Sequence, residues 1–165
     1  METERLILRP WALADVDALH RLWTDAQVRR WLWDDVTITR DGAEAVVRAC
    51  VRSAEESGIG MWCVLPRGGD SVIGFCGFRF VDDTRDVEIL YGFLPAFWGQ
   101  GLATEAGWAV LDYGFGAGLF ERVYGRTDVP NRASIKVLEK LGMRFEKQIL
   151  VGDLPTLCYS LAKPE

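Results

Sequence analysis

Two closely spaced glycines are the first residues of this sequence whose type and spacing could support chemistry. Gly99 and Gly101 follow an apolar run typical of a strand, and a helical pattern begins at Leu102. The first amides of a helix have no intrahelical partners and lie at the positive end of its dipole, so a loop without bulky side chains can present them to an anion. The spacing therefore predicts a pyrophosphate site formed by these residues: Trp98, Gly99, Gln100, Gly101, Leu102, Ala103 and Thr104.

Two better-known phosphate-binding loops do not fit this segment. The P-loop of nucleotide hydrolases needs Lys followed by Ser or Thr after its last glycine, where this chain has Leu102 and Ala103. The dinucleotide-binding fingerprint needs Gly or Ala at the position of Thr104, together with an acidic residue on a second strand. A glycine turn that only starts a helix is the alternative left open.

A carboxylate in the preceding strand pattern is the second candidate. Residues 86–93 alternate in polarity, which places Glu88 opposite an apolar and aromatic set: Val87, Ile89, Tyr91 and Phe93. A carboxylate there could take a proton from an amine, and the alternative is a solvated side chain with no catalytic role. His20 is the only histidine, so a catalytic histidine pair or triad lacks its second member.

The elements that must position these groups alternate between strand and helix patterns. Strand patterns cover residues 5–9, 60–65, 72–81, 86–93, 122–127, 146–151 and 156–161. Helical patterns follow Asp15, Thr39 and Asn131 as N-caps, and another covers residues 102–113 before a glycine cluster that begins at Gly114. The layout predicts a mixed α+β fold: one domain over residues 1–165, with a central, mostly antiparallel sheet of six to seven strands and about four helices on its faces.

Composition excludes several classes of partner. The chain has 19 Lys and Arg against 24 Asp and Glu, a net charge of −5, which lacks the basic excess typical of nucleic-acid-binding proteins. It contains no apolar run near the roughly 20 residues of a membrane span, and its first residues do not form a secretory signal. We therefore expect a cytoplasmic protein that binds neither membrane nor nucleic acid. The four cysteines are scattered, which favours buried thiols over disulfides or a metal site.

The order of these elements, together with two segments, resembles a known enzyme superfamily. The segments are Trp98–Ala103 and Asn131–Met143. The chain is similar over nearly its whole length to the GCN5-related N-acetyltransferase (GNAT) superfamily, and within it to the Rim-type ribosomal-protein N-acetyltransferases. Trp98 stands where most of the family has Gln or Arg, a departure common in the Rim-type branch.

The resemblance implies acetyl-CoA as co-substrate and a cofactor cleft where two parallel strands separate after Tyr91. The loop from Gln100 to Thr104 would bind the pyrophosphate. Backbone groups of Phe93 and Leu94, with the side chain of Asn131, would hold the pantetheine arm. A helix cap is an equally satisfactory reading of Asn131.

The resemblance also implies roles in acetyl transfer. Glu88 would be the base, acting through water, and Ser134 would be the donor to the leaving thiolate, since Leu138 occupies the position of the tyrosine that many relatives use. Ser134 as an ordinary residue of a first helical turn is the alternative. Trp31 and Trp33 flank a loop that covers the acceptor side in relatives, so we expect them, with Tyr91, to contact the acceptor; for the two tryptophans packing is the alternative.

The predicted function is direct transfer of an acetyl group from acetyl-CoA to a primary amine in a ternary complex. The amine would belong to a protein N-terminus or a small molecule. Two alternatives remain at this point: a catalytically silent domain that binds or senses acyl-CoA, and an enzyme that uses another acyl-CoA. The protein would be a monomer or a homodimer.

Overall fold

The computed structural model describes residues 1–81 and 84–164, which contain one mixed sheet of seven strands in the order β1-β2-β3-β4-β5-β7-β6. Every neighbouring pair is antiparallel except β4 and β5, which are parallel. The predicted fold class is therefore confirmed. The strands are β1 (Leu6–Pro10), β2 (Met61–Pro66), β3 (Gly74–Phe80), β4 (Val87–Phe93), β5 (Arg122–Asp128), β6 (Arg144–Val151) and β7 (Leu154–Ala162).

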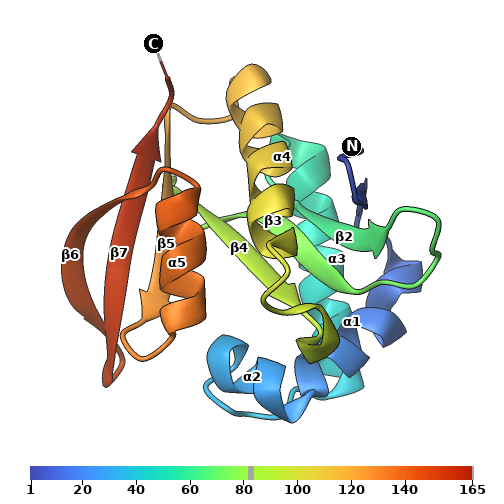
Figure 1. The fold of residues 1–165 in the computed structure, drawn as a ribbon. Helices are drawn as coiled ribbons and strands as arrows, with labels where there is room; N and C mark the ends of the chain where they lie inside the picture. Colours follow the sequence, from blue (N-terminus) through green and yellow to red (C-terminus); the bar gives the residue numbers. More distant parts are fainter. Residues whose placement is uncertain (82–83, 165) are drawn as a thin grey trace.

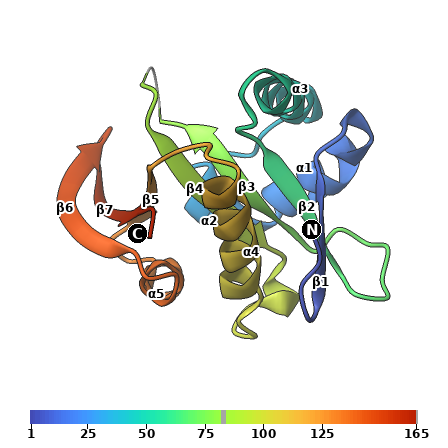
Figure 2. The same ribbon diagram turned by 90° about the horizontal axis from the view of Figure 1, so that it is seen from above.

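Helices cover both faces of the sheet (Figures 1 and 2). They are α1 (Val16–Thr24), α2 (Ala26–Leu32), α3 (Arg40–Ser57), α4 (Leu102–Gly116) and α5 (Arg132–Lys140), with short 3-10 turns at Leu13–Asp15 and Pro95–Phe97. The α1 and α3 side has a core that includes Trp23 and Val47, and the α4 and α5 side has one that includes Val110 and Leu138. No helix within the described residues is long and apolar enough to cross a membrane.

Most helix ends follow the local sequence signals. The Thr39 hydroxyl accepts a hydrogen bond from the Gly42 amide, and the Asn131 side chain accepts one from the Ser134 amide, so both predicted N-caps are confirmed. Asp15 precedes α1 but makes no capping hydrogen bond to it. Its carboxylate is buried and pairs instead with the guanidinium of Arg9. That prediction is corrected because a charge-assisted pair is a stronger partner than a helix amide.

The glycine cluster does not end α4 where the sequence suggests. The helix continues through Gly114 to Gly116. A Cβ atom at Gly114 would lie 2.5 Å from the ring of Phe120 and 3.0 Å from that of Phe78. Gly114 therefore allows close approach of aromatic rings, and it does not terminate the helix.

The separation of β4 from β5 positions the functional site. The parallel pairing is limited to Val87 with Val123 and Glu88 with Tyr124, whereas β5 stays paired with β7 as far as Asp128. The strands thus part before Tyr91, and not after it as expected. Figure 1 shows β4 and β5 diverging toward the bottom of the view, with α5 standing beside β5 and α2 below. Tyr91 of β4 and Ser134 of α5 are in contact beside this separation.

Candidate active site

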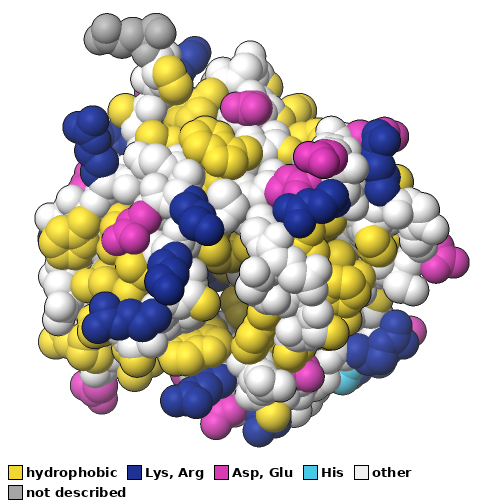
Figure 3. Space-filling view, viewed as in Figure 1, with side chains coloured by type: hydrophobic (Ala, Val, Ile, Leu, Met, Phe, Trp, Pro, Cys, Tyr) yellow, Lys and Arg dark blue, Asp and Glu magenta, His cyan; other side chains and the backbone are white. Residues whose placement is uncertain are grey.

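A cavity of about 1030 Å³ opens where the two parallel strands part. Its walls include β4 from Glu88 onward, the end of β5, the first turn of α4, the length of α5, and residues of α2 with the loop after it. Figure 3 shows the molecule hollowed near the centre of this face, with hydrophobic side chains in the walls. The volume is that of a site for a sizeable small molecule.

The glycine loop forms one end of the cavity. Gly99 and Gly101 have φ angles of +74° and +78°, a left-handed conformation that glycine adopts without strain. Gly101 is the N-cap of α4 and has no side chain to satisfy the first turn, whose first helical bond runs from the Glu105 amide to the Gly101 carbonyl. The amides of Leu102, Ala103 and Thr104 are therefore without intrahelical partners at the cavity wall.

The side chains of two residues near this loop donate hydrogen bonds to backbone carbonyls. Gln100 does not line the cavity, because its side chain donates to the Ala96 carbonyl at 3.0 Å. The Trp98 indole donates to the Phe93 carbonyl at 2.6 Å and so ties the loop to the end of β4.

Arg5 braces the same loop, a contact that sequence reasoning missed. Its guanidinium donates to the Gln100 carbonyl at 2.9 Å and pairs with the Glu105 carboxylate at 2.6 Å. Burial raises the pKa of Glu105, but hydrogen bonds from Thr3 and Arg5 outweigh that effect and leave the pKa below its usual value. No local pattern could reveal this brace, since Arg5 belongs to the start of the chain.

The backbone of β4 presents free groups to the cavity. The Leu94 amide donates to the Ile73 carbonyl, and the Leu94 carbonyl accepts from the Phe97 amide, both at 2.9 Å. Since neighbouring residues of a strand direct their backbone groups to opposite sides, those of Tyr91 and Phe93 point toward the cleft. With the Phe93 carbonyl taken by Trp98, the groups on this edge that pair with no other described strand are the Tyr91 amide and carbonyl and the Phe93 amide.

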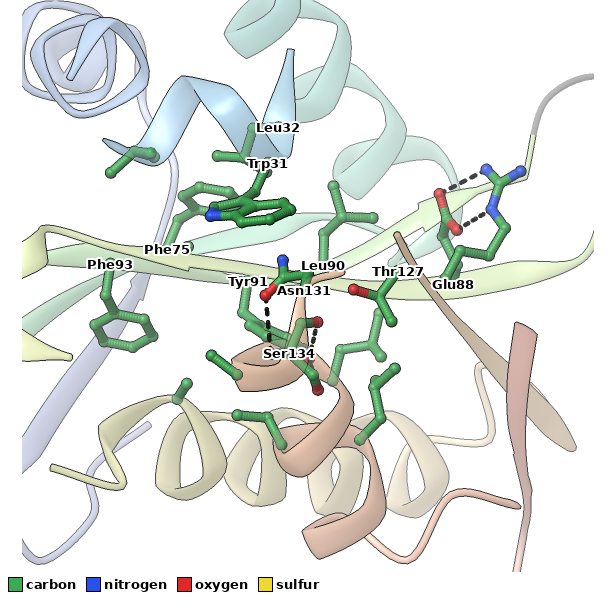
Figure 4. Close-up of a pocket in the computed structure, with 18 of the residues that line it drawn as sticks. Trp31, Leu32, Phe75, Glu88, Leu90, Tyr91, Phe93, Thr127, Asn131 and Ser134 are labelled. Carbon is green, nitrogen blue, oxygen red and sulfur yellow. Dashed lines mark hydrogen bonds and ion pairs between the residues drawn. The ribbon is translucent and has the colours of Figure 1, made fainter. Parts of the chain in front are cut away.

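A cluster of hydroxyl and amide groups lies at the middle of the cavity (Figure 4). The Tyr91 hydroxyl is 2.8 Å from the Ser134 Oγ and 3.1 Å from the Ser134 carbonyl oxygen. Asn131 Oδ1 accepts from the Ser134 amide at 3.1 Å. The structure thus brings Tyr91, Asn131 and Ser134 together in the cavity.

Glu88 lies apart from this cluster and is held by two arginines. Its side chain is 1% exposed, so it is not a solvated carboxylate. Oε1 accepts from Arg79 at 2.6 Å, and Arg126 donates to Oε2 at 2.6 Å and to Oε1 at 3.0 Å. Water that served Glu88 would have to compete with a guanidinium at either oxygen.

Asp128 is a second carboxylate at the cavity, and sequence reasoning missed it. It is the last residue of β5 and lines the cavity, and its carboxylate makes no hydrogen bond or ion pair with any described residue. Burial and the charge of Asp34, which lines the cavity from the loop after α2, raise the pKa of Asp128. The signal that could have identified Asp128 is its position at the carboxyl end of a parallel strand, beside the point where two strands separate.

Trp31 and Trp33 both line the cavity, and both also pack against other residues. Figure 4 shows Trp31 across the cavity from Tyr91 and Asn131. The guanidinium of Arg30 lies 5.0 Å from the Trp31 ring centre. Trp33 packs edge-on against Trp23 at 5.6 Å, and its buried indole N–H has no partner among the described residues. Contact with an acceptor and packing are therefore compatible at these positions.

Basic side chains line the outer wall of the cavity although the whole chain is acidic. Arg132, Lys136 and Lys140 on α5 are exposed and repeat at a spacing of four residues, which places them on one side of the helix. This local charge suits a ligand that carries phosphate groups.

Comparison with known proteins identifies the family. Residues 5–144 match the model of the acetyltransferase (GNAT) domain. The chain is 32% identical to the N-acetyltransferase p20 of Bacillus licheniformis over 156 residues, which cover 92% of this chain and 84% of that protein.

Solved structures share the fold over almost the whole chain. A GNAT-family acetyltransferase from Bacillus anthracis aligns with a TM-score of 0.82 and 24% identity, covering 100% of this chain and 99% of that one. The ribosomal-protein alpha-N-acetyltransferase RimL, solved with coenzyme A, aligns with a TM-score of 0.82 and 18% identity, covering 97% and 95%. The chain belongs to the GNAT family of acetyltransferases.

Proposed function

We propose that this protein transfers an acetyl group from acetyl-CoA to a primary amine. One observation carries the proposal: the glycine loop, the edge of β4 and the Tyr91–Ser134 pair all line one cavity where β4 and β5 separate. Acetyl-CoA needs these three features, since it joins a diphosphate, an amide-containing arm and a thioester in one extended molecule.

The cofactor would lie along the cavity from the loop to Ser134. The amides of Leu102, Ala103 and Thr104 would bind the diphosphate, with the glycines leaving room for it. Around Gly99 a Cβ would meet nothing within 4 Å, so the backbone there is open to a ligand. The pantetheine amides would pair with the strand edge at Tyr91 and Phe93, beside Leu94 and Asn131.

The reaction needs a proton acceptor and a group that stabilises the leaving sulfur. The amine is largely protonated near pH 7, so it must lose a proton before its nitrogen lone pair attacks the thioester carbonyl carbon. The C–S bond then breaks, the thiolate leaves with the bonding pair, and the nitrogen loses its second excess proton to solvent or, through water, to the thiolate, so that a neutral amide forms. We assign Ser134 as the hydrogen-bond donor to that thiolate.

Two carboxylates are candidates for the base. Glu88 is the candidate that the sequence suggested, and it would act through water despite its two arginine partners. The observations favour Asp128, because its carboxylate is free of partners within the described residues, and burial and the charge of Asp34 raise its pKa above its usual value.

The acceptor is proposed to enter between Trp31, Trp33 and the end of β5. A protein N-terminus is one acceptor class, because the fold neighbour RimL is a ribosomal-protein alpha-N-acetyltransferase. A small amine fits the same opening, since acceptor loops vary within one fold.

Two measurements test this function. Calorimetry should show binding of coenzyme A by the folded protein, and Gly101→Ala should weaken it while Gly116→Ala does not. Thiol release from acetyl-CoA should then rise with one member of a panel of peptides and small amines. Binding without turnover by any amine would support a sensor domain, and equal or faster turnover with succinyl-CoA would support another acyl donor.

A further inference from the structure

The Tyr91 hydroxyl is the least explained polar group of the cavity. It comes from the middle of β4, and its oxygen meets two oxygens of one residue on α5. A phenylalanine ring would fill the same space on this side of the strand, so the hydroxyl adds a hydrogen-bonding contact that ring packing alone does not require.

Tyr91 and Ser134 have only two hydroxyl protons to share among their hydrogen bonds. A phenol and a serine hydroxyl each carry one proton, and the Ser134 carbonyl oxygen can only accept. Tyr91 either donates to the carbonyl at 3.1 Å while Ser134 donates to the phenol, or donates to Ser134 Oγ at 2.8 Å. In the second arrangement the serine proton is free to point elsewhere.

Only the second arrangement lets Ser134 donate to a ligand. Asn131 takes the Ser134 amide and not its hydroxyl, so within the described residues Tyr91 is the one hydrogen-bond partner of Ser134 Oγ. We infer that Tyr91 is a positioning residue: it donates to Ser134 Oγ and so directs the serine proton at the sulfur of the departing thiolate. This inference rests on the proposed acetyl transfer.

Tyr91 suits this task because it keeps its proton. Burial raises the pKa of Tyr91 well above its usual value, and the hydrogen bond with Ser134 only partly counters that effect. The phenol therefore remains a donor throughout the assay range and does not become the acid itself. A serine that accepts from a neutral donor is also polarised, which strengthens the hydrogen bond that it donates.

A double-mutant cycle tests the inference. Tyr91→Phe keeps the ring and removes the hydroxyl, and Ser134→Ala removes the group that it positions. We expect each variant to lower kcat by about a hundredfold, the lower end of the range found for one lost transition-state donor, with KM for acetyl-CoA changed by less than about threefold. In the Ser134→Ala background, Tyr91→Phe should cost less than about twofold more.

Tyr113→Phe is the matched control, since Tyr113 is on α4, is exposed and does not line the cavity. It should leave kcat unchanged. Thermal melts and calorimetric binding of coenzyme A should show that Tyr91→Phe folds and binds the cofactor as the unaltered protein does.

Three outcomes would overturn the inference. An unchanged kcat in Tyr91→Phe would show that the contact has no part in turnover. Additive losses in the double variant would mean that Tyr91 acts without Ser134, as a donor in its own right. If the unaltered protein acetylates no amine, the proposed function fails and this inference fails with it. If the unaltered protein is active, the results for Tyr91→Phe bear on the inference alone.

Discussion

Glu88 and Asp128 show how strongly environment separates two carboxylates of one cavity. Glu88 is buried between two guanidinium groups, and removal of its charge would leave Arg79 and Arg126 facing a neutral amide. Asp128 has the charge of Asp34 nearby and no cationic partner within the described residues. A raised pKa with a free carboxylate is the usual setting of a general base.

The pH dependence of kcat/KM should follow Asp128. Since protonation removes the base, activity should fall as the pH drops through the pKa of Asp128, and Asp128→Asn should abolish this acid limb and lower kcat/KM at least about a hundredfold. Asp34→Asn removes a like charge and so makes Asp128 easier to deprotonate, which should move the limb to lower pH. The measurement is the pH profile of thiol release.

Glu88→Gln provides the comparison for that profile. We expect this variant to keep the acid limb and to lose stability, because it disrupts a buried ion pair. An acid limb that survives in Asp128→Asn and disappears in Glu88→Gln would assign the base to Glu88 instead.

At the scale of elements, the proposed phosphate site depends on the glycine loop and the start of α4. A left-handed glycine ends the loop, and the next three amides face the cavity. Arg5 fixes the loop from outside by bonding the Gln100 carbonyl and Glu105. The helix alone supplies donors, and the loop conformation decides whether a diphosphate can reach them.

Gly101→Ala should raise KM for acetyl-CoA several-fold with a smaller effect on kcat. A Cβ at φ +78° costs about 1 kcal/mol or more, so the loop would relax and misplace its amides. Gly116→Ala is the matched control because Gly116 has no positive φ angle and a Cβ there meets nothing within 4 Å. Equal KM values for the two variants would show that the loop does not bind the cofactor.

At the scale of the whole molecule, the helices on each face bury a separate core against one sheet. The Arg9–Asp15 pair ties β1 to the segment that enters α1, with Asp15 Oδ1 2.6 Å from the guanidinium and its side chain 6% exposed. Burial raises the pKa of Asp15, but the bonds from Arg9 and the Ala12 amide outweigh it, so the pKa lies below its usual value.

Asp15→Asn should lower the free energy of unfolding at pH 7 by about 1–3 kcal/mol, because it breaks a charge-assisted pair in a buried position. The pH dependence of this stabilisation follows from the lowered pKa of Asp15. The stabilisation is complete above the unfolded pKa of about 3.9, and it is lost as the pH falls through the folded pKa. Denaturant unfolding of both proteins at a series of pH values should show the two converging in acid.

Asp17→Asn removes a carboxylate whose side chain is 68% exposed, and it should change stability by less than about 0.5 kcal/mol. A difference between Asp15→Asn and the unaltered protein that persists at low pH would contradict the assigned role of the Asp15 charge.

The sequence by itself determined the features that depend on near neighbours. Glycines at 99 and 101, the caps at Thr39 and Asn131 and the alternation of β4 side chains between the two faces of the sheet are readable because each involves residues within a turn or a strand. The end of α4 could not be predicted from the sequence, because Gly114 allows aromatic rings to pack against the helix, and this packing exists only in the folded chain.

Tertiary structure alone decided which groups meet in the cavity. Tyr91 and Ser134 are 43 residues apart, Glu88 and Arg126 are 38 apart, and Arg5 and Gln100 are 95 apart. Periodicity reports which face of its own element a residue occupies, and it carries no information on the residue of another element opposite it. The order of the strands, and the point where β4 leaves β5, set those partners and with them the environment of each carboxylate.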